Sequence, residues 1–150
     1  MDLVKLRKQL EIDEGIVNEI YNDHLGYPTF GIGHLITEDD PEEGLPVGTP
    51  VSEERIQQAF ESDIEWVLSD CNKLYDNFDS LPEEVQQIIA NMMFNLGYPR
   101  LSKFKGMKSG VLNEDWDTAA DEMLDSRWAR QVGARAERLA DRMRIVGIPH

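Results

Sequence analysis

The stretch IDEGIVNEIYNDHLGYPTFGIGH, residues 12–34, carries most of the information in this 150-residue chain. It places two carboxylates, Glu14 and Asp23, and one hydroxyl, Thr29, on different predicted elements: a helix, a turn and a short strand. Groups on different elements can face one another across a cleft instead of lying side by side on one helix. Hydrolysis of an acetal needs a proton donor and a carboxylate that directs water. The stretch therefore favours a sugar-cleaving enzyme.

Each of these three residues also has an explanation that requires no catalysis. A Glu near a helix end is usually solvated, and an Asp before Gly and Pro commonly forms an Asx-type turn. A Thr is in any case a good strand residue. Considered singly, each residue is better explained by its structural role, so the residue types alone do not establish catalysis.

The composition is that of a small globular domain. The length suits one domain or one domain with two lobes, and 41% hydrophobic residues can supply a core. No apolar run approaches the ~18 residues of a membrane span, and the N-terminal residues do not resemble a secretory signal peptide. The single cysteine, Cys71, cannot form an internal disulfide and suits a reducing compartment. We expect it to be a buried apolar residue and not a reactive thiol.

The net charge of −14 argues against several ligands. Nucleic acid would be repelled, because its binding relies on clustered Lys and Arg. The acidic run at residues 38–43 lacks the ligand spacing of a calcium loop, so we interpret it as a solvated loop. His24, His34 and His150 have no metal-ligand spacing, and we expect neither a metal nor a cofactor.

Apolar spacing and turn residues predict the order of the elements. Leu3, Leu6, Leu10, Ile12 and Ile16 indicate an opening helix. Short strands and turns are expected at residues 20–36, followed by a loop or ragged strand at 38–51. Ser52 is expected to cap a helix of about 25 residues. Its predicted buried stripe consists of Ile56, Phe60, Ile64, Val67, Cys71, Leu74 and Phe78.

A second helix is predicted from Ser80, which has capping-box spacing to Glu83, to a stop at Gly97. This helix is apolar on more than one side, which predicts a place at the centre of a helical lobe. Shorter helices are expected at 101–109, 115–124 and 134–145. The predicted fold is mostly helical α+β. It has a small β-containing N-terminal lobe at about 12–52, a connecting helix at about 52–78, and a helical lobe at about 80–146 that also holds the N-terminal helix.

Six motifs in order resemble those of the phage-type lysozymes, the T4-lysozyme-like endolysins of glycoside hydrolase family 24. They are IDEG around Glu14, YxD at 21–23, GYxTxGIGH ending at His34, FxxD at 60–63, NMxFxxG at 91–97 and SRWxxQ at 126–131. The motifs span most of the chain, so together they are far more specific than any one of them. The resemblance implies a two-lobed lysozyme fold and a muramidase that cleaves peptidoglycan.

The resemblance also implies roles for individual residues. Glu14 would be the general acid, Asp23 the carboxylate that directs water, and Thr29 the third catalytic residue. Sugar contacts would come from Leu35, Asn91, Phe94, Asn95 and Gln131, although a place in the core is the alternative for Phe94 and Trp128. His34 would form a structural ion pair with Asp63, and Arg135 would reach the catalytic Glu. Inversion of configuration rests on the resemblance alone.

The same resemblance implies a biological setting. The protein would act as a monomeric endolysin that stays in the host cytoplasm until a holin-type membrane pore releases it to the wall. Two other functions remain open. A lytic transglycosylase would need no water-directing carboxylate, so Asp23 argues against it. A non-catalytic wall-binding module could use the same fold. The acidic charge is unexpected, since peptidoglycan is itself anionic.

Overall fold

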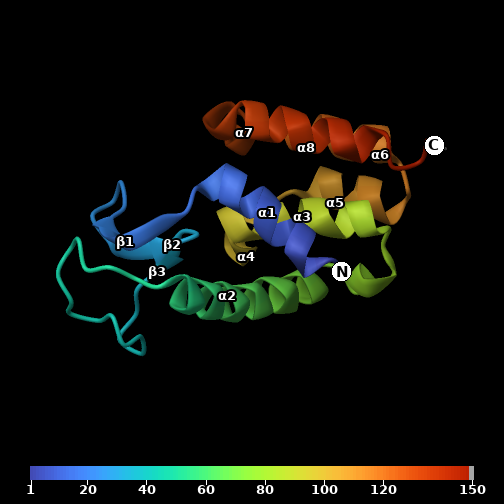
Figure 1. Cartoon of the computed structure of the whole chain (residues 1–150). Coiled ribbons are helices and arrows are strands. Elements are labelled where there is room, and N and C mark those ends of the chain that lie inside the picture. The colour runs from blue at the N-terminus through green and yellow to red at the C-terminus, as the bar shows by residue number, and fades with distance from the viewer. Residues whose placement is uncertain (149–150) are drawn as a thin grey trace. The chain divides into compact units, whose positions relative to one another are not determined.

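The computed structural model describes residues 1–148, and the chain divides into two compact units (Figure 1). The N-terminal unit comprises Val4–Trp66, and the C-terminal unit comprises Met1–Leu3 together with the chain from Val67 onward. The fold is mostly helical with one small antiparallel sheet, which confirms the predicted α+β class. None of the helices in the described chain is both long and apolar enough to span a bilayer.

The N-terminal unit opens with helix α1, Leu3–Glu14, which buries Leu6 and Leu10. The helix ends because Gly15 adopts a φ of +79°, a left-handed conformation that glycine tolerates without a Cβ clash. The predicted helical face was therefore too long. Ile12 is 73% exposed, and Ile16 lies beyond the helix.

Three short strands form the sheet in the order β1-β2-β3, drawn in blue in Figure 1. Their bounds are β1 Val17–Asn22, β2 Pro28–Gly31 and β3 His34–Leu35. Both pairings are antiparallel, with Tyr21 opposite Thr29 and Thr29 opposite Leu35. Cross-strand partners point to the same face of a sheet. Tyr21, Thr29 and Leu35 therefore form one row across the three strands.

A long loop joins β3 to helix α2, and an isolated antiparallel bridge pairs Pro50 of this loop with Glu19 of β1. The interpretation of its acidic run as fully solvated was wrong for two members. Arg55 donates to Asp40 at 3.0 Å and to Glu42 at 2.9 and 3.0 Å, and Glu42 is only 8% exposed. The Arg55 guanidinium also lies 5.4 Å from the ring centre of Phe30. These contacts tie the loop to α2 and to the sheet.

Helix α2, Glu53–Leu74, begins as predicted: Ser52 Oγ accepts a hydrogen bond from the backbone N–H of Arg55 at 3.1 Å. Every member of its predicted apolar stripe is buried. The helix ends at Leu74, however, and Phe78 is buried from a separate 3₁₀ turn, Phe78–Ser80. Cys71 is completely buried, and burial with the nearby charge of Asp70 raises its pKa to about 12, which makes the thiol unreactive.

Helix α3, Glu83–Leu96, starts three residues later than predicted, and Ser80 does not cap it. Pro82 disfavours helical backbone at the residue before it, and Leu81 is accordingly extended, with φ −70° and ψ 153°. The run from Val85 to Met93 is buried throughout, which confirms that α3 is central to the helical part. Gly97 ends the helix with a φ of +79°.

Five shorter helices complete the described chain: α4 Tyr98–Leu101, α5 Lys105–Leu112, α6 Trp116–Leu124, α7 Arg127–Val132 and α8 Ala134–Arg144. The helices expected at 115–124 and 134–145 are confirmed. The one expected at 101–109 is instead two helices, because Phe104 has a non-helical ψ of 64°. Helix α7 was not predicted. Ser126 caps it by accepting from the N–H of Ala129 at 3.1 Å.

Candidate active site

Glu14 is the last residue of α1 and is partly buried. The backbone N–H of Gly15 donates to the carbonyl of Glu11 at 2.9 Å, so the helical hydrogen bonding runs up to the point where the chain turns away. This position fixes the backbone of Glu14 on a regular element, while the following Gly15 leads the chain into the sheet. Regular elements hold catalytic groups more rigidly than loops do.

Asp23 organises the turn that follows β1. Its Oδ1 atom accepts hydrogen bonds from the N–H groups of Leu25 and Tyr27, both at 2.9 Å. Its backbone N–H donates to the carbonyl of Tyr27, and its carbonyl accepts from Gly26. The Asx-type turn considered as a structural alternative is therefore present. It also orients the carboxylate, because one oxygen is bound to the backbone and no described residue donates to Oδ2.

Thr29 is buried at 4% exposure in the middle strand. Its hydroxyl donates to the carbonyl of Tyr27 at 2.9 Å. A hydroxyl has one hydrogen and two acceptor lone pairs. Once the hydrogen is committed to Tyr27, Thr29 can act toward a third molecule only as an acceptor.

Tyr21 brings the two carboxylates into one electrostatic environment. Burial raises the pKa of its phenol, and the negative charges of Asp23 and Glu14 raise it further. Charges act on a partly buried group in this way only at short range. The phenol of Tyr21, in the same cross-strand row as Thr29, is thus close to both carboxylates. The YxD motif contained this residue, but nothing in its spacing distinguished it from an ordinary strand aromatic.

His34 is held by carboxylates on both sides. Its Nδ1 lies 2.8 Å from Asp63 Oδ2 on α2, and its Nε2 lies 2.9 Å from Asp40 Oδ2 in the loop. The ring packs edge-on against Phe30. Because both ring nitrogens are engaged, His34 has no free position from which to exchange a proton with a substrate. The partner in the loop, Asp40, was missed by the sequence analysis because the acidic run looked like an ordinary solvated segment.

The hydrogen bonds of His34 with Asp63 and Asp40 make the free energy of unfolding depend on pH. Burial by itself would lower the pKa of His34, but the hydrogen bonds to Asp63 and Asp40 outweigh it and the pKa is raised. The pKa of Asp40 is lowered, because the hydrogen bonds from Thr37 and His34 outweigh its burial. The His34 contribution is complete below about pH 6.5 and is lost as pH rises through the raised pKa. The Asp40 contribution is present above about pH 4 and is lost as pH falls further.

We predict that His34→Gln lowers the free energy of unfolding by about 1.5–3 kcal/mol at pH 5–6, the range typical of hydrogen bonds to charged groups. The deficit should shrink at higher pH, as His34 of the unsubstituted protein loses its proton. Denaturant unfolding between pH 5 and 9 measures it, with His24→Gln, at an exposed position, as the control. A deficit that is the same at every pH would contradict the assignment.

In the C-terminal unit, two of the predicted site residues bind each other. The Arg135 guanidinium donates to Asn91 Oδ1 at 3.0 and 2.8 Å, and both side chains are buried. Asn91 is 1% exposed, so in this structure it holds Arg135 and offers no surface to a ligand. The predicted approach of Arg135 to Glu14, and the catalytic role of Glu14, stay predictions.

The other predicted residues of this unit differ in exposure. Asn95 Oδ1 accepts from the indole N–H of Trp128 at 2.6 Å, and Trp128 is buried, as the core alternative predicted. Phe94 is partly buried, and Gln131 is exposed and accepts from Arg100 at 3.3 Å. Their contacts with sugar stay predictions. Residues 1–148 contain no group of three or more His, Cys, Asp or Glu side chains that could hold a metal ion, and His150 lies outside the described residues.

Comparison with known proteins decides the family. The phage lysozyme family model matches residues 11–144, which include Glu14, Asp23 and Thr29. The chain belongs to the phage lysozyme family. A probable T4-type lysozyme of Dictyostelium discoideum is 30% identical over 156 aligned residues, which cover 89% of this chain and 90% of that protein.

Two phage relatives place a similar sequence within longer proteins. The pre-baseplate central spike protein Gp5 of Enterobacteria phage T4 is 28% identical and aligns with 91% of this chain but only 27% of its own length. The peptidoglycan hydrolase gp36 of Pseudomonas phage phiKMV is 26% identical and aligns with 95% of this chain and 15% of its own length. Phage lysozyme sequences thus occur both as short proteins and as parts of larger ones.

Proposed function

We propose that this phage lysozyme family member is a muramidase that hydrolyses the β-1,4 bond between N-acetylmuramic acid and N-acetylglucosamine in peptidoglycan. Family membership and the name of the phiKMV relative support the substrate. The observation that carries the reaction is a pair of carboxylates: Glu14 at the end of α1, and Asp23 in the turn after β1, where two backbone N–H groups hold one of its oxygens. Most glycoside hydrolases use a pair of Asp or Glu carboxyl groups that flank the bond to be cleaved.

In the proposed reaction Glu14 donates a proton to the glycosidic oxygen, which makes the sugar a good leaving group. A water molecule attacks the anomeric carbon as that bond breaks, and Asp23 takes the proton that the water loses. Proton exchange with solvent then returns both carboxyl groups to their starting states. Because water attacks directly, no covalent glycosyl-enzyme forms, and configuration inverts.

The hydrogen bonds around Asp23 and Thr29 support this assignment of the water. Asp23 Oδ1 is occupied by two backbone N–H groups, which leaves Oδ2 to accept from the water. The Thr29 hydroxyl hydrogen is donated to Tyr27, which leaves a lone pair to accept the second water hydrogen. A water that donates both hydrogens to the protein presents its own lone pair to the anomeric carbon. This orientation is the contribution expected of a water-positioning pair.

The main alternative, a lytic transglycosylase, closes an anhydro ring within the substrate and needs no bound water. The acceptor pair of Asp23 and Thr29 would have no role in it, which favours hydrolysis. Product analysis by mass spectrometry tests the proposal. Purified peptidoglycan treated with the protein should yield fragments with reducing N-acetylmuramic acid ends. Anhydromuramyl ends would establish the transglycosylase, and release of no fragments would leave only the wall-binding module.

The wider role is part of the same proposal. The protein would be a monomeric endolysin, held in the host cytoplasm until a holin-type pore lets it reach the wall. Leu35, Phe94, Asn95 and Gln131 are proposed to contact the sugars, and Asn91 and Arg135 to support the site. The T4 spike relative is a structural phage protein by its name, so an endolysin is one of at least two settings in which such a sequence occurs.

A further inference from the structure

The negative charge of the protein is concentrated in one unit. Val4–Trp66 contains 15 acidic and 4 basic residues, for a net charge of −11, whereas the remainder contains 14 acidic and 11 basic residues, for a net charge of −3. Within that remainder, residues 85–113 contain no acidic residue and four basic ones. The C-terminal unit therefore contains a local excess of positive charge within a strongly acidic protein.

Five exposed cations of the C-terminal unit, between residues 100 and 130, make no ion pair within residues 1–148. Arg142 of the same unit pairs with Glu84, and Arg144 pairs with Asp117 and Asp121. The five, which we call the basic patch, are exposed and pair with no carboxylate of residues 1–148: Arg100, Lys103, Lys105, Arg127 and Arg130. Because these five exposed cations pair with no carboxylate of the described residues, they are available to an external anion.

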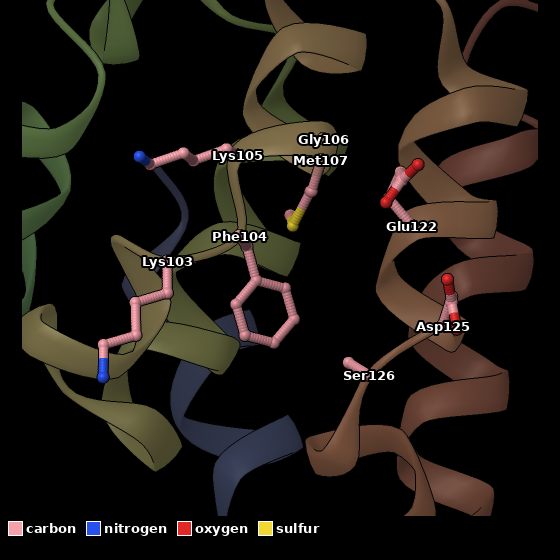
Figure 2. A pocket seen from close by; sticks show the side chains of 8 residues that line it. All are labelled: Lys103, Phe104, Lys105, Gly106, Met107, Glu122, Asp125 and Ser126. Carbon is pink, nitrogen blue, oxygen red and sulfur yellow. The ribbon is translucent and has the colours of Figure 1, made fainter.

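One hydrogen bond and one shared pocket link the segments that carry these cations. Arg100 of α4 donates to Gln131 of α7 at 3.3 Å. Ser126, which caps α7 just before Arg127, lines the same pocket of about 240 Å³ as Lys103 and Lys105 (Figure 2). In Figure 2 both lysine side chains extend away from the carboxylates of Glu122 and Asp125 on the opposite wall. Neither lysine forms an ion pair with the two acids that line the pocket.

We propose that the basic patch binds the free carboxylates of peptidoglycan stem peptides and so holds the protein on its polymeric substrate. This inference rests on the proposed function. Stem-peptide carboxylates recur along each glycan strand, so several cations can bind one strand at the same time. The overall affinity then exceeds that of any single contact. At about 0.15 M salt the screening length is about 8 Å. An anion must therefore come within about this distance of the cations to be attracted by them.

The triple variant Lys103→Gln, Arg127→Gln, Arg130→Gln tests the proposal in the full chain. The readout is co-sedimentation with insoluble peptidoglycan from which all attached phosphate polymers have been stripped, in the cold, before turbidity falls. We expect binding to weaken by on the order of tenfold at about 0.15 M salt, since each exposed ion pair contributes modestly. The salt dependence of the remaining binding should also be shallower.

A matched control changes the net charge by the same three units elsewhere. Gln58→Glu, Ser62→Glu, Ser69→Glu places three new carboxylates at exposed positions of α2. We expect it to alter binding by less than about twofold at this salt. If both triple variants bind peptidoglycan equally weakly, only the net charge of the protein matters, and the proposal that the basic patch binds the wall is refuted. Thermal unfolding of both variants verifies that they are folded.

Two further outcomes would also overturn the proposal. Weakening seen only on walls that keep their phosphate polymers would mean that the patch binds phosphate, and a change of oligomeric state on neutralisation would mean that it binds a second copy. The test is independent of the chemistry. Fragment release with unchanged binding of the triple variant would refute the patch and leave the muramidase. Weaker binding of the triple variant without fragment release by the unsubstituted protein would refute the muramidase and support the patch.

Discussion

Glu14→Gln should reduce the release of fragments from peptidoglycan by about 1000-fold or more while leaving the fold intact. A glutamine amide keeps the size and the hydrogen-bonding capacity of the side chain but cannot transfer a proton to the glycosidic oxygen. General acid catalysis typically contributes 10²–10⁴-fold, and a sugar alkoxide leaves poorly without it. The measurement is the initial rate of turbidity loss or of reducing-end formation at saturating substrate.

Glu11→Gln provides a matched control for this variant. Glu11 lies one turn earlier on α1, carries the same charge and pairs with Arg7 at 2.9 Å. Its replacement makes the same charge change on the same helix and removes a partly exposed ion pair worth at most about 1 kcal/mol. We expect its rate to stay within about twofold of the unsubstituted protein. If Glu14→Gln is as active as Glu11→Gln, Glu14 has no part in the reaction and the protein is not the muramidase proposed above.

The elements that the sequence predicted well are those governed by local chemistry. Ser52 begins α2 and Gly97 ends α3 because a capping oxygen and a left-handed glycine act within one turn of the chain. The α2 stripe from Ile56 to Leu74 follows from helical periodicity alone. The failure at Ser80 has an equally local cause. Ser80 has capping-box spacing to Glu83, but Pro82 restricts Leu81 to an extended backbone, so the helix begins only after Pro82.

The contacts that the sequence could not predict are those between distant residues. Asp40 and Glu42 belong to a run of acids that composition alone describes as solvated, and only the position of Arg55 on another element shows that they are paired. Trp128 needed a partner for its indole N–H, but nothing identified Asn95, 33 residues away. Tyr21 likewise required the strand register before its place beside Thr29 was evident. The candidate site was therefore predictable as a set of residues but not as a hydrogen-bonded arrangement.

Gly110→Ala should destabilise the protein by about 2–3 kcal/mol, because it forces apart two packed helices. A Cβ at Gly110 on α5 would lie 2.7 Å from the backbone nitrogen of Ala119 and 3.0 Å from its Cα, both on α6. Backbone atoms cannot swing aside, and the short turn between the helices is fixed by a 2.8 Å hydrogen bond from Asp115 N–H to the Gly110 carbonyl. The higher helix propensity of alanine offsets only about 1 kcal/mol of this destabilisation.

Gly106→Ala separates this clash from the general effect of adding a methyl group to α5. A Cβ at Gly106 would lie 2.5 Å from the carboxylate of Glu122, a contact as short as that at Gly110. Here, however, the neighbouring atoms are the far end of an exposed, flexible side chain, which can rotate into solvent. We expect its unfolding free energy to stay within about 0.5 kcal/mol of the unsubstituted value or to rise slightly. Equal losses in the two variants, measured by denaturant unfolding with unchanged m-values, would refute the backbone clash as the cause, because only Gly110 faces atoms that cannot move.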